Sequence, residues 1–347
     1  MPLPPLYGHE LIRNRLVGAI ASGRLPQALL FEGPRGAGKQ RLALWLAQAI
    51  HCEQFGADSR EPCGSCRACK LVLTLSHPDV HWFIPLELAK KGADADKQVE
   101  LAEVALAEDL AARRERPLYE PPGGMASHGL ASVRLLLRRL VLTPVLGRHK
   151  VFIIGDAERL IPQQANPEAA NALLKALEEP PADTVFVLTA SEPESLLPTI
   201  RSRVVRVRVL RVPDSVVTSF VQNELKSSVQ RKELAETVRR AEGRIGRVLA
   251  AGGDRVAGGF SEALREEGKP AGRYALALKQ MPFQARGGFT AMLDELLERL
   301  RAEARRGEAT KVVEAIAQVL EARDLAQSNV NPQLLTAVLG EDLTERR

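Results

Sequence analysis

The sequence lacks any uninterrupted run of about 18 apolar residues, the length that a helix needs to cross a membrane. Its first ten residues, MPLPPLYGHE, contain no basic segment followed by an apolar core, so they show no secretory signal. These two absences predict a cytoplasmic protein that makes no use of a membrane.

Cysteine is also scarce, since the chain has only four, and all of them lie between residues 52 and 69. In a reducing compartment, such clustering favours a metal site over disulfide bonds. The C-x10-C-x2-C-x2-C spacing suits four thiolates around one Zn²⁺, which leaves no open position for water and makes the site structural. Four unpaired buried cysteines or a redox pair are alternatives that explain the clustering less well. The predicted zinc ligands are Cys52, Cys63, Cys66 and Cys69.

Length and composition are those of a globular protein. A chain of 347 residues is long enough for two or three domains, and 45% hydrophobic with 26% charged residues is an ordinary globular balance. The net charge of +5 is mildly basic, which permits contact with nucleic acid without establishing it.

Short apolar runs alternate with helical patterns in the first 200 residues. The apolar runs are continuous, as expected for strands that helices cover on both faces. This order predicts an α/β domain with a parallel sheet in three layers. The predicted strands are 27–33, 79–84, 150–155 and 184–190, and the predicted helices among them are 39–50, 130–141 and 168–179.

Two other regions have a different character. Residues 85–128 interrupt the alternation and contain a strong helical pattern at 96–116, which we interpret as an insertion with at least one surface helix. Beyond residue 210 no strand pattern occurs, and long helical patterns at 287–306 and 310–327 dominate. A small helical domain followed by a helical bundle is therefore expected.

Residues 33–40, GPRGAGKQ, match the phosphate-binding pattern G-x-x-x-x-G-K-[ST] except at the last position. Backbone N–H groups of such a loop, with the positive end of the following helix, can bind the phosphates of ATP. The missing hydroxyl would normally bind Mg²⁺. A glycine-rich turn without a ligand is the alternative. The candidate nucleotide-binding residues are Gly33, Gly36, Gly38, Lys39 and Gln40, with Asp156 from a later strand.

The acidic strand end expected of such a site is also altered in "KVFIIGDAERL" (150–160). One register places Gly155 where a metal-binding Asp is expected and Asp156 where a water-activating Glu is expected. A shift by one residue makes Asp156 the metal ligand and Glu158 a poor base. Neither register has an intact pair, so efficient ATP hydrolysis by this chain alone is not expected.

The segment "ANALLKALEEPPADTVFVLTASEPESLLPTIRSR" (170–203) resembles bacterial clamp-loader subunits, which are AAA+ proteins. The cysteine cluster, "SHPDV" (76–80) and "NVNPQLLTAVL" (329–339) occur along the chain in the same order as in that family. With its altered metal contacts, the chain is most similar to the delta-prime type, rather than the ATP-hydrolysing gamma/tau type.

The resemblance implies a RecA-like AAA+ domain at 1–210, a helical lid at 211–256 and a helical collar for oligomerisation at 257–347. It implies partnership with gamma/tau and delta subunits in the DNA polymerase III holoenzyme, which loads a sliding clamp onto primed DNA. The delta-prime type is a stator without independent ATPase activity.

The stator donates an arginine finger to a neighbour's ATP, from a motif that here is Ser202-Arg203-Val204 without its usual Cys. Arg203 is the predicted finger and Arg201 the alternative. In the lid, Gly246 takes the place of a sensor arginine, although Arg247 is adjacent.

Two other functions compete with the stator. The first is an ATP-hydrolysing motor of the gamma/tau type, which Gln40 and Gly155 disfavour. The second is a DNA-binding AAA+ repair protein, which the lack of a distinct DNA-reading motif disfavours.

Overall fold

The structure is a computed structural model that describes most of the chain and divides it into two compact units. The first comprises residues 1–120 and 126–249, and the second comprises 121–125 and 250–347. The described residues are 2–56, 59–87, 94–115, 126–160, 168–225, 231–248, 277–278, 289–304, 309–327 and 330–345.

The first unit contains a five-stranded sheet in which all adjacent strands are parallel. The order across the sheet is β2-β3-β4-β1-β5, so β1 and β3 both pair with β4. The strands are β1 (Ala28–Glu32), β2 (Val80–Phe83), β3 (Lys150–Ile154), β4 (Thr184–Ala190) and β5 (Val205–Arg208).

The predicted strands are confirmed, and their continuous burial explains why the pattern was readable. Every residue of β1, β3 and β4 is buried, with Phe152 stacked near Phe83 and Phe186 in the core. The sequence analysis missed β5, which is an edge strand with mostly exposed residues. Its Val-Arg alternation is the pattern of a half-buried strand, but the surrounding arginines concealed it.

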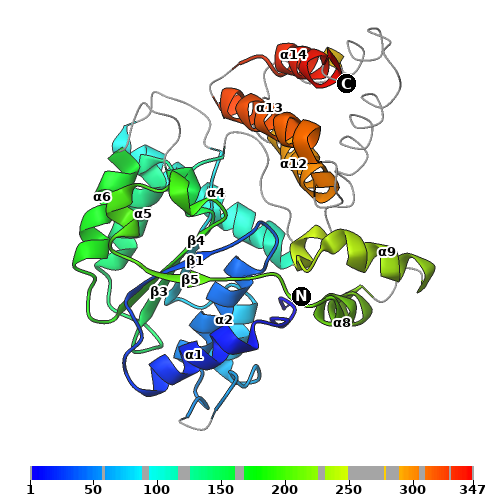
Figure 1. The fold of residues 1–347 in the computed structure, drawn as a ribbon. Helices are drawn as coiled ribbons and strands as arrows, with labels where there is room; N and C mark the ends of the chain where they lie inside the picture. The colour runs from blue at the N-terminus through cyan, green and yellow to red at the C-terminus, as the bar shows by residue number, and fades with distance from the viewer. Residues whose placement is uncertain are drawn as a thin grey trace. The chain divides into compact units, whose positions relative to one another are not determined.

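Helices cover both faces of this sheet, as the predicted three layers require. Parallel strands are joined by right-handed crossovers. The β1–β2 connection therefore lies on one face of the sheet, and the β2–β3 and β3–β4 connections, which cross the sheet in the opposite direction, lie on the other. Figure 1 shows α1 and α2 on one side of the strands and α5 and α6 on the other. The helices of this region are α1 (Glu10–Ala21), α2 (Lys39–His51), α3 (Arg67–Leu73), α4 (Ala95–Glu115), α5 (Leu130–Leu140), α6 (Glu168–Glu178) and α7 (Pro198–Arg201), with 3-10 turns at Ala157–Leu160 and Pro193–Ser195.

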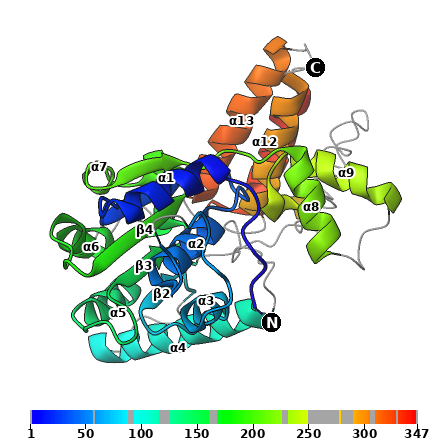
Figure 2. The same ribbon diagram turned by 90° about the horizontal axis from the view of Figure 1, so that it is seen from below.

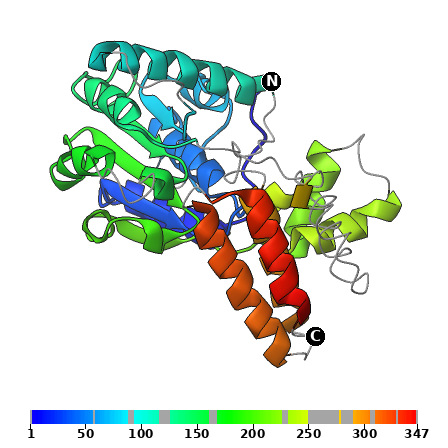
Figure 3. The same cartoon turned by 90° about the horizontal axis from the view of Figure 1, so that it is seen from above.

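The insertion predicted at 85–128 is closed at its base by an antiparallel bridge between Leu86 and Ser127. Its helix α4 packs against α5, and Figure 3 shows the two side by side. The predicted surface helix therefore has a buried stripe, formed by Val99, Ala102 and Leu106. Most of residues 117–129, which follow α4, lie outside the described residues.

A small helical part follows β5 in the first unit. Helices α8 (Asp214–Glu224) and α9 (Arg231–Ala241) share their own apolar core, and a 3-10 turn at Ile245–Arg247 comes after them. The N-terminal segment packs here, since Tyr7 contacts Phe220 edge-on and donates a hydrogen bond to Glu224.

The second unit is helical in its described residues, as predicted. Helix α12 (Thr290–Ala304) packs against α13 (Ala309–Gln327), as Figure 2 shows. Helix α13 also packs against α14 (Pro332–Glu345). The buried contacts are apolar, and include Leu293 and Val319. An ion pair of 2.6 Å joins Arg323 to Asp294.

The predicted class, a parallel α/β domain followed by helical segments, is confirmed. The domain boundaries at residues 210 and 256 stay predictions, and the second lies within residues 249–276, outside the described part. No described helix is long and apolar enough to cross a membrane.

The buried stripe of α4 makes a testable distinction between two leucines of one helix. Leu106 is 1% exposed and Leu101 is 46% exposed. We expect Leu106→Ala to lower the free energy of unfolding by about 2–4 kcal/mol, because it leaves a cavity beneath α4. The matched Leu101→Ala should change it by about 0.5 kcal/mol or less, as measured by urea unfolding. Equal effects would show that α4 is not part of the core.

Candidate functional site

The phosphate-binding loop lies where the sequence places it, between the end of β1 and the start of α2. Gly36 and Gly38 have φ values of 81° and 94°, in the left-handed region that glycine tolerates. Gly33 is required for another reason, since a Cβ there would lie 2.1 Å from the carbonyl oxygen of Val209. The predicted strand, loop and helix are thus confirmed as structure.

The side chain of Lys39 is folded back into this loop and is buried. Its Nζ donates hydrogen bonds to the carbonyl oxygens of Gly33 at 2.8 Å and Pro34 at 3.0 Å, and to Ser191 Oγ at 2.9 Å. Burial lowers the pKa of Lys39, and the carboxylates of Glu158 and Asp156 oppose this shift. All three ammonium protons therefore have acceptors, so binding a phosphate would require Lys39 to exchange at least one of them.

Ser191 and Glu158 both lie beside Lys39, and the sequence analysis included neither of them among the candidate nucleotide-binding residues. Ser191 follows β4, and its backbone N–H donates to Glu158 Oε1 at 3.0 Å. Burial, with a smaller contribution from Asp156, raises the pKa of Glu158 from 4.5 to about 7. Its other oxygen is buried and accepts no hydrogen bond from the described residues. In the sequence, only the position of Ser191 at the carboxyl end of a buried strand could have indicated that it belongs to this site.

The structure distinguishes between the two registers left open at the end of β3. A Cβ built on Gly155 would lie 2.9 Å from Gln40 Nε2 and 3.1 Å from Gln40 Oε1. A side chain at position 155 would thus point at position 40, which is the relation of the two Mg²⁺ ligands in phosphate-loop enzymes. This geometry favours the register in which Gly155 stands at the position of the metal-binding Asp and Asp156 follows it.

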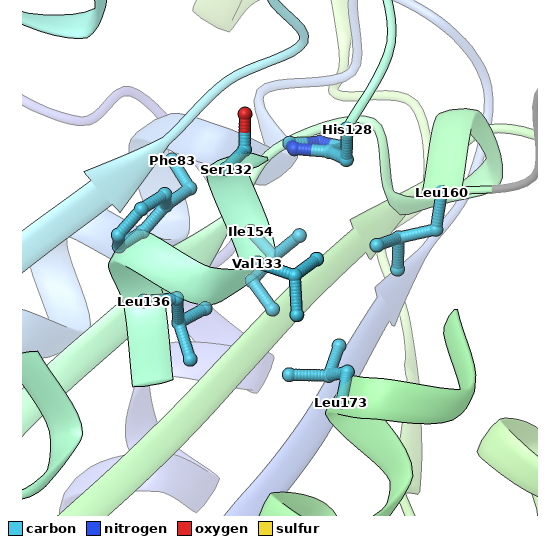
Figure 4. Close-up of a pocket in the computed structure, with 8 residues that line it drawn as sticks. All are labelled: Phe83, His128, Ser132, Val133, Leu136, Ile154, Leu160 and Leu173. Atoms are coloured by element: carbon cyan, nitrogen blue, oxygen red, sulfur yellow. The ribbon is translucent and has the colours of Figure 1, made fainter. Parts of the chain in front are cut away.

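The backbone carbonyl of Gly155 forms a hydrogen bond with the buried ring of His128. His128 Nε2 lies 2.6 Å from the Gly155 carbonyl oxygen, and because a carbonyl only accepts, the ring must donate. Burial lowers the pKa of His128 to about 4, which keeps the ring neutral. His128 and Ser132 form the polar side of a small, otherwise apolar cavity (Figure 4). Its other lining residues are Phe83, Val133, Leu136, Ile154, Leu160 and Leu173.

The turn after α9 contacts the phosphate loop directly. The N–H of Gly246 donates to the carbonyl oxygen of Gly36 at 3.0 Å, and a Cβ on Gly246 would lie 2.8 Å from the Gly36 Cα. An arginine at position 246 would therefore not fit in this arrangement. The adjacent Arg247 forms a 3.6 Å ion pair with Glu242.

The two candidate finger arginines lie at the end of α7 with different partners. Arg203 Nη1 donates to the Thr199 carbonyl oxygen at 2.8 Å, and its Nη2 lies 2.5 Å from Glu178 Oε1. Arg201 forms an ion pair with Glu194 instead. The side chain of Arg203 is about one third exposed, so part of its guanidinium faces the surface. Glu178 comes from "NALLKALEEPP", so two separated parts of the family segment meet here.

The four cysteines converge as predicted. Their Sγ atoms all lie within 4.8 Å of one another, with Cys52 after α2, Cys66 as the cap of α3, and Cys69 inside α3. Backbone N–H groups point at three of the sulfurs, for example that of Cys66 at Cys63 Sγ at 3.3 Å. This hydrogen bond is the main reason why the pKa of Cys63 is lowered to about 6. A cluster of four sulfurs with N–H donors suits a metal with thiolate ligands.

A second buried cluster brings His51, the last residue of α2, together with His77 and Asp79 of the "SHPDV" segment. Both oxygens of Asp79 accept backbone N–H groups, those of Val145, Leu146 and Gly147, at 2.6–2.8 Å. The two histidine rings lie against each other with centroids 4.2 Å apart and a tilt of 39° between their planes. Because the carboxylate is already satisfied by three donors, this cluster fastens the loop between α5 and β3 to the sheet.

The buried Glu158 makes a prediction about pH. Its folded-state pKa of about 7 exceeds the ordinary 4.5, so the folded chain holds a proton that the unfolded chain has released. Stability that Glu158 contributes is therefore lost as the pH rises from about 4.5 to about 7. Relative to the wild type, Glu158→Gln should gain about 2–3 kcal/mol of unfolding free energy between pH 5 and pH 8. Denaturant unfolding at both pH values measures this, and a pH-independent difference would contradict it.

Comparison with known proteins agrees with the resemblance. A sequence model of the family described as DNA polymerase III, delta subunit, matches residues 8–213, which is more than half of the chain. The chain is 35% identical over 192 residues to the DNA polymerase III subunit delta' of Bacillus subtilis, covering 55% of this chain and 44% of that one. It is 30% identical over 237 residues to the Escherichia coli subunit delta', covering 68% and 58%.

A gamma/tau subunit is also similar, and none of these matches spans the relative fully. The gamma/tau subunit of Mycobacterium bovis is 32% identical over 199 residues, which cover 57% of this chain and 27% of that one. The chain thus aligns with between about a quarter and three fifths of these relatives. Because the family model covers more than half of the chain, including all five strands of the sheet, the chain belongs to the DNA polymerase III delta subunit family.

Proposed function

We propose that this chain is a clamp-loader stator of the delta-prime type, which helps an ATP-driven complex place a sliding clamp on primed DNA. Its partners would be gamma/tau and delta subunits, the clamp and primed DNA, and it would work in the cytoplasm. Membership of the family and the likeness to delta' subunits support this proposal. The domains proposed with it are the AAA+ domain at 1–210, the lid at 211–256 and the collar at 257–347.

The observation that carries the proposal is that the guanidinium of Arg203 is fixed in place and partly exposed at the surface. The guanidinium is anchored by Thr199 and Glu178, yet part of it stays exposed at the end of α7. Arginine is always charged and can bind phosphate oxygens through two N–H groups at once. An arginine held in this way at a surface suits donation to ATP bound by another subunit, which is the role of an arginine finger.

The chain's own phosphate loop supports a stator over a motor. Gln40 and Gly155 replace the two side chains that would bind Mg²⁺, and Gly246 replaces the sensor arginine. The alternative, a gamma/tau-type motor, has one point in its favour, since a gamma/tau subunit is among the similar proteins. Steady-state ATP hydrolysis by the purified chain distinguishes the two. Turnover that Lys39→Ala abolishes would establish the motor.

The cysteine cluster would hold one structural Zn²⁺. Cys52, Cys63, Cys66 and Cys69 would supply all four ligands, so no position would remain for water or substrate. Their place beside α2 and α3 suits a role in fastening this region to the AAA+ domain.

The finger makes a prediction for the reconstituted complex with gamma/tau and delta subunits, clamp and primed DNA. With Arg203→Ala, we expect hydrolysis at the neighbouring ATP site to fall by about 10³-fold or more, because nothing replaces the guanidinium on the phosphate. Total DNA-stimulated ATPase should fall clearly while size-exclusion chromatography shows assembly retained.

Two further variants identify the arginine that acts. Arg203→Lys keeps the charge without the planar fork and should restore only part of the activity. Arg201→Ala is the matched control, because Arg201 lies on the same turn and pairs with Glu194. Full hydrolysis with Arg203→Ala would refute this finger, and a loss with Arg201→Ala alone would assign it to Arg201.

The zinc site predicts one zinc per chain by elemental analysis. Cys69→Ser should lose this zinc and unfold at a lower temperature, because a buried thiolate ligand is removed. Lys70→Ala, on the exposed side of the same helix, should keep it. A folded wild-type protein without metal would contradict the assignment.

A further inference from the structure

The amide of Gln40 is packed against the bare backbone of Gly155. A Cβ on Gly155 would meet the amide carbon of Gln40 at 3.0 Å, as well as the nitrogen and oxygen of that amide. Gln40 Oε1 is buried and accepts no hydrogen bond from the described residues. The space between the two positions is therefore filled by the glutamine side chain.

This space is where phosphate-loop enzymes bind Mg²⁺, between a hydroxyl on the first turn of the helix and a carboxylate at the end of the strand. Mg²⁺ demands six oxygens in near-octahedral geometry and usually takes at least one carboxylate. The residues present do not fit this ion, because position 155 has no carboxylate and position 40 has no hydroxyl. The adjacent Glu158 has one oxygen engaged by the Ser191 N–H, and its raised pKa of about 7 leaves much of it neutral.

The two replacements depend on each other. A side chain at position 155 would force the Gln40 amide to move, because its Cβ alone would lie 2.9–3.1 Å from the amide atoms. A short residue at position 40 would leave an empty space above Gly155, which costs packing contacts. Gln40 and Gly155 thus form one packed contact, and each explains why the other is tolerated.

We propose that the Gln40–Gly155 contact is a plug that fills the magnesium position of the phosphate loop. Mg²⁺ then does not increase the affinity of this loop for a nucleotide. Lys39, whose three protons are held by Gly33, Pro34 and Ser191, would then meet a phosphate without a metal beside it. The nucleotide site of this chain is therefore decoupled from the divalent cation on which its neighbour's ATP depends.

Calorimetric titration of the full chain with ATP, in excess Mg²⁺ and in excess EDTA, tests the plug. The expected result is that Mg²⁺ changes the affinity by about twofold or less, and undetectable binding under both conditions also agrees with it. Tightening by about tenfold or more with Mg²⁺ would overturn the proposal, because it would make Gln40 Oε1 and Asp156 working ligands.

Restoring both ligands is the sharper test. The double variant Gln40→Thr/Gly155→Asp should gain Mg²⁺-dependent ATP binding of about tenfold or more, and neither single variant should. A double variant that folds and gains no such dependence would show that another group fills the position. That result would also overturn the proposal.

A stability cycle keeps the idea testable if the double variant does not fold. Gly155→Ala should lower the melting temperature more in the wild type than in Gln40→Ser, because only the wild type places an amide against the new methyl group. Equal shifts would overturn the packed contact. These measurements use the chain alone, so their outcome is separate from that of the Arg203 variants in the complex.

Discussion

Parallel pairing of the strands brings the carboxyl ends of β1, β3 and β4 to one edge of the sheet, and the candidate nucleotide site depends on it. The pairs Leu30–Leu188 and Ile154–Leu188 place the ends of three distant segments side by side. The phosphate loop, Gly155 and Ser191 each follow one of these strands directly. Because the strands are buried on both faces, a shift of register would expose apolar side chains, which fixes where these residues meet.

Glycine determines how closely the parts of this site approach. Because Gly155 lacks a Cβ, the amide of Gln40 can pack against its backbone, and Gly246 allows the same close approach to the backbone of Gly36. At both positions, related ATPases are expected to have charged side chains that act on the metal or the phosphate. Their replacement by glycine removes chemistry and adds direct packing at the same time. The phosphate loop thereby becomes part of a closed structure, with Lys39 turned onto the loop's own carbonyl groups.

Near α7, by contrast with the closed phosphate loop, a charged side chain stays partly exposed at the surface. Arg203 ends the segment that most resembles clamp-loader subunits, Glu178 lies in its first helix, and the two meet as an ion pair. Such a half-exposed pair contributes little to stability, because water screens it. It does orient a guanidinium at the surface. A chain with a closed site of its own and a displayed arginine is suited to assist the ATP site of a partner.

The sequence alone determined the features that depend on local pattern and spacing. Continuous apolar runs predicted the four buried strands, and glycine spacing predicted the phosphate loop. Cysteine spacing predicted the metal-type cluster. The tertiary structure was needed for β5, whose exposed edge weakens the apolar pattern. It was also needed for the register at Gly155, since only the direction of a Cβ toward Gln40 distinguishes it from Asp156. The raised pKa of Glu158 and the Glu178–Arg203 pair arise from burial and contact between distant segments, and no local pattern in a sequence records either.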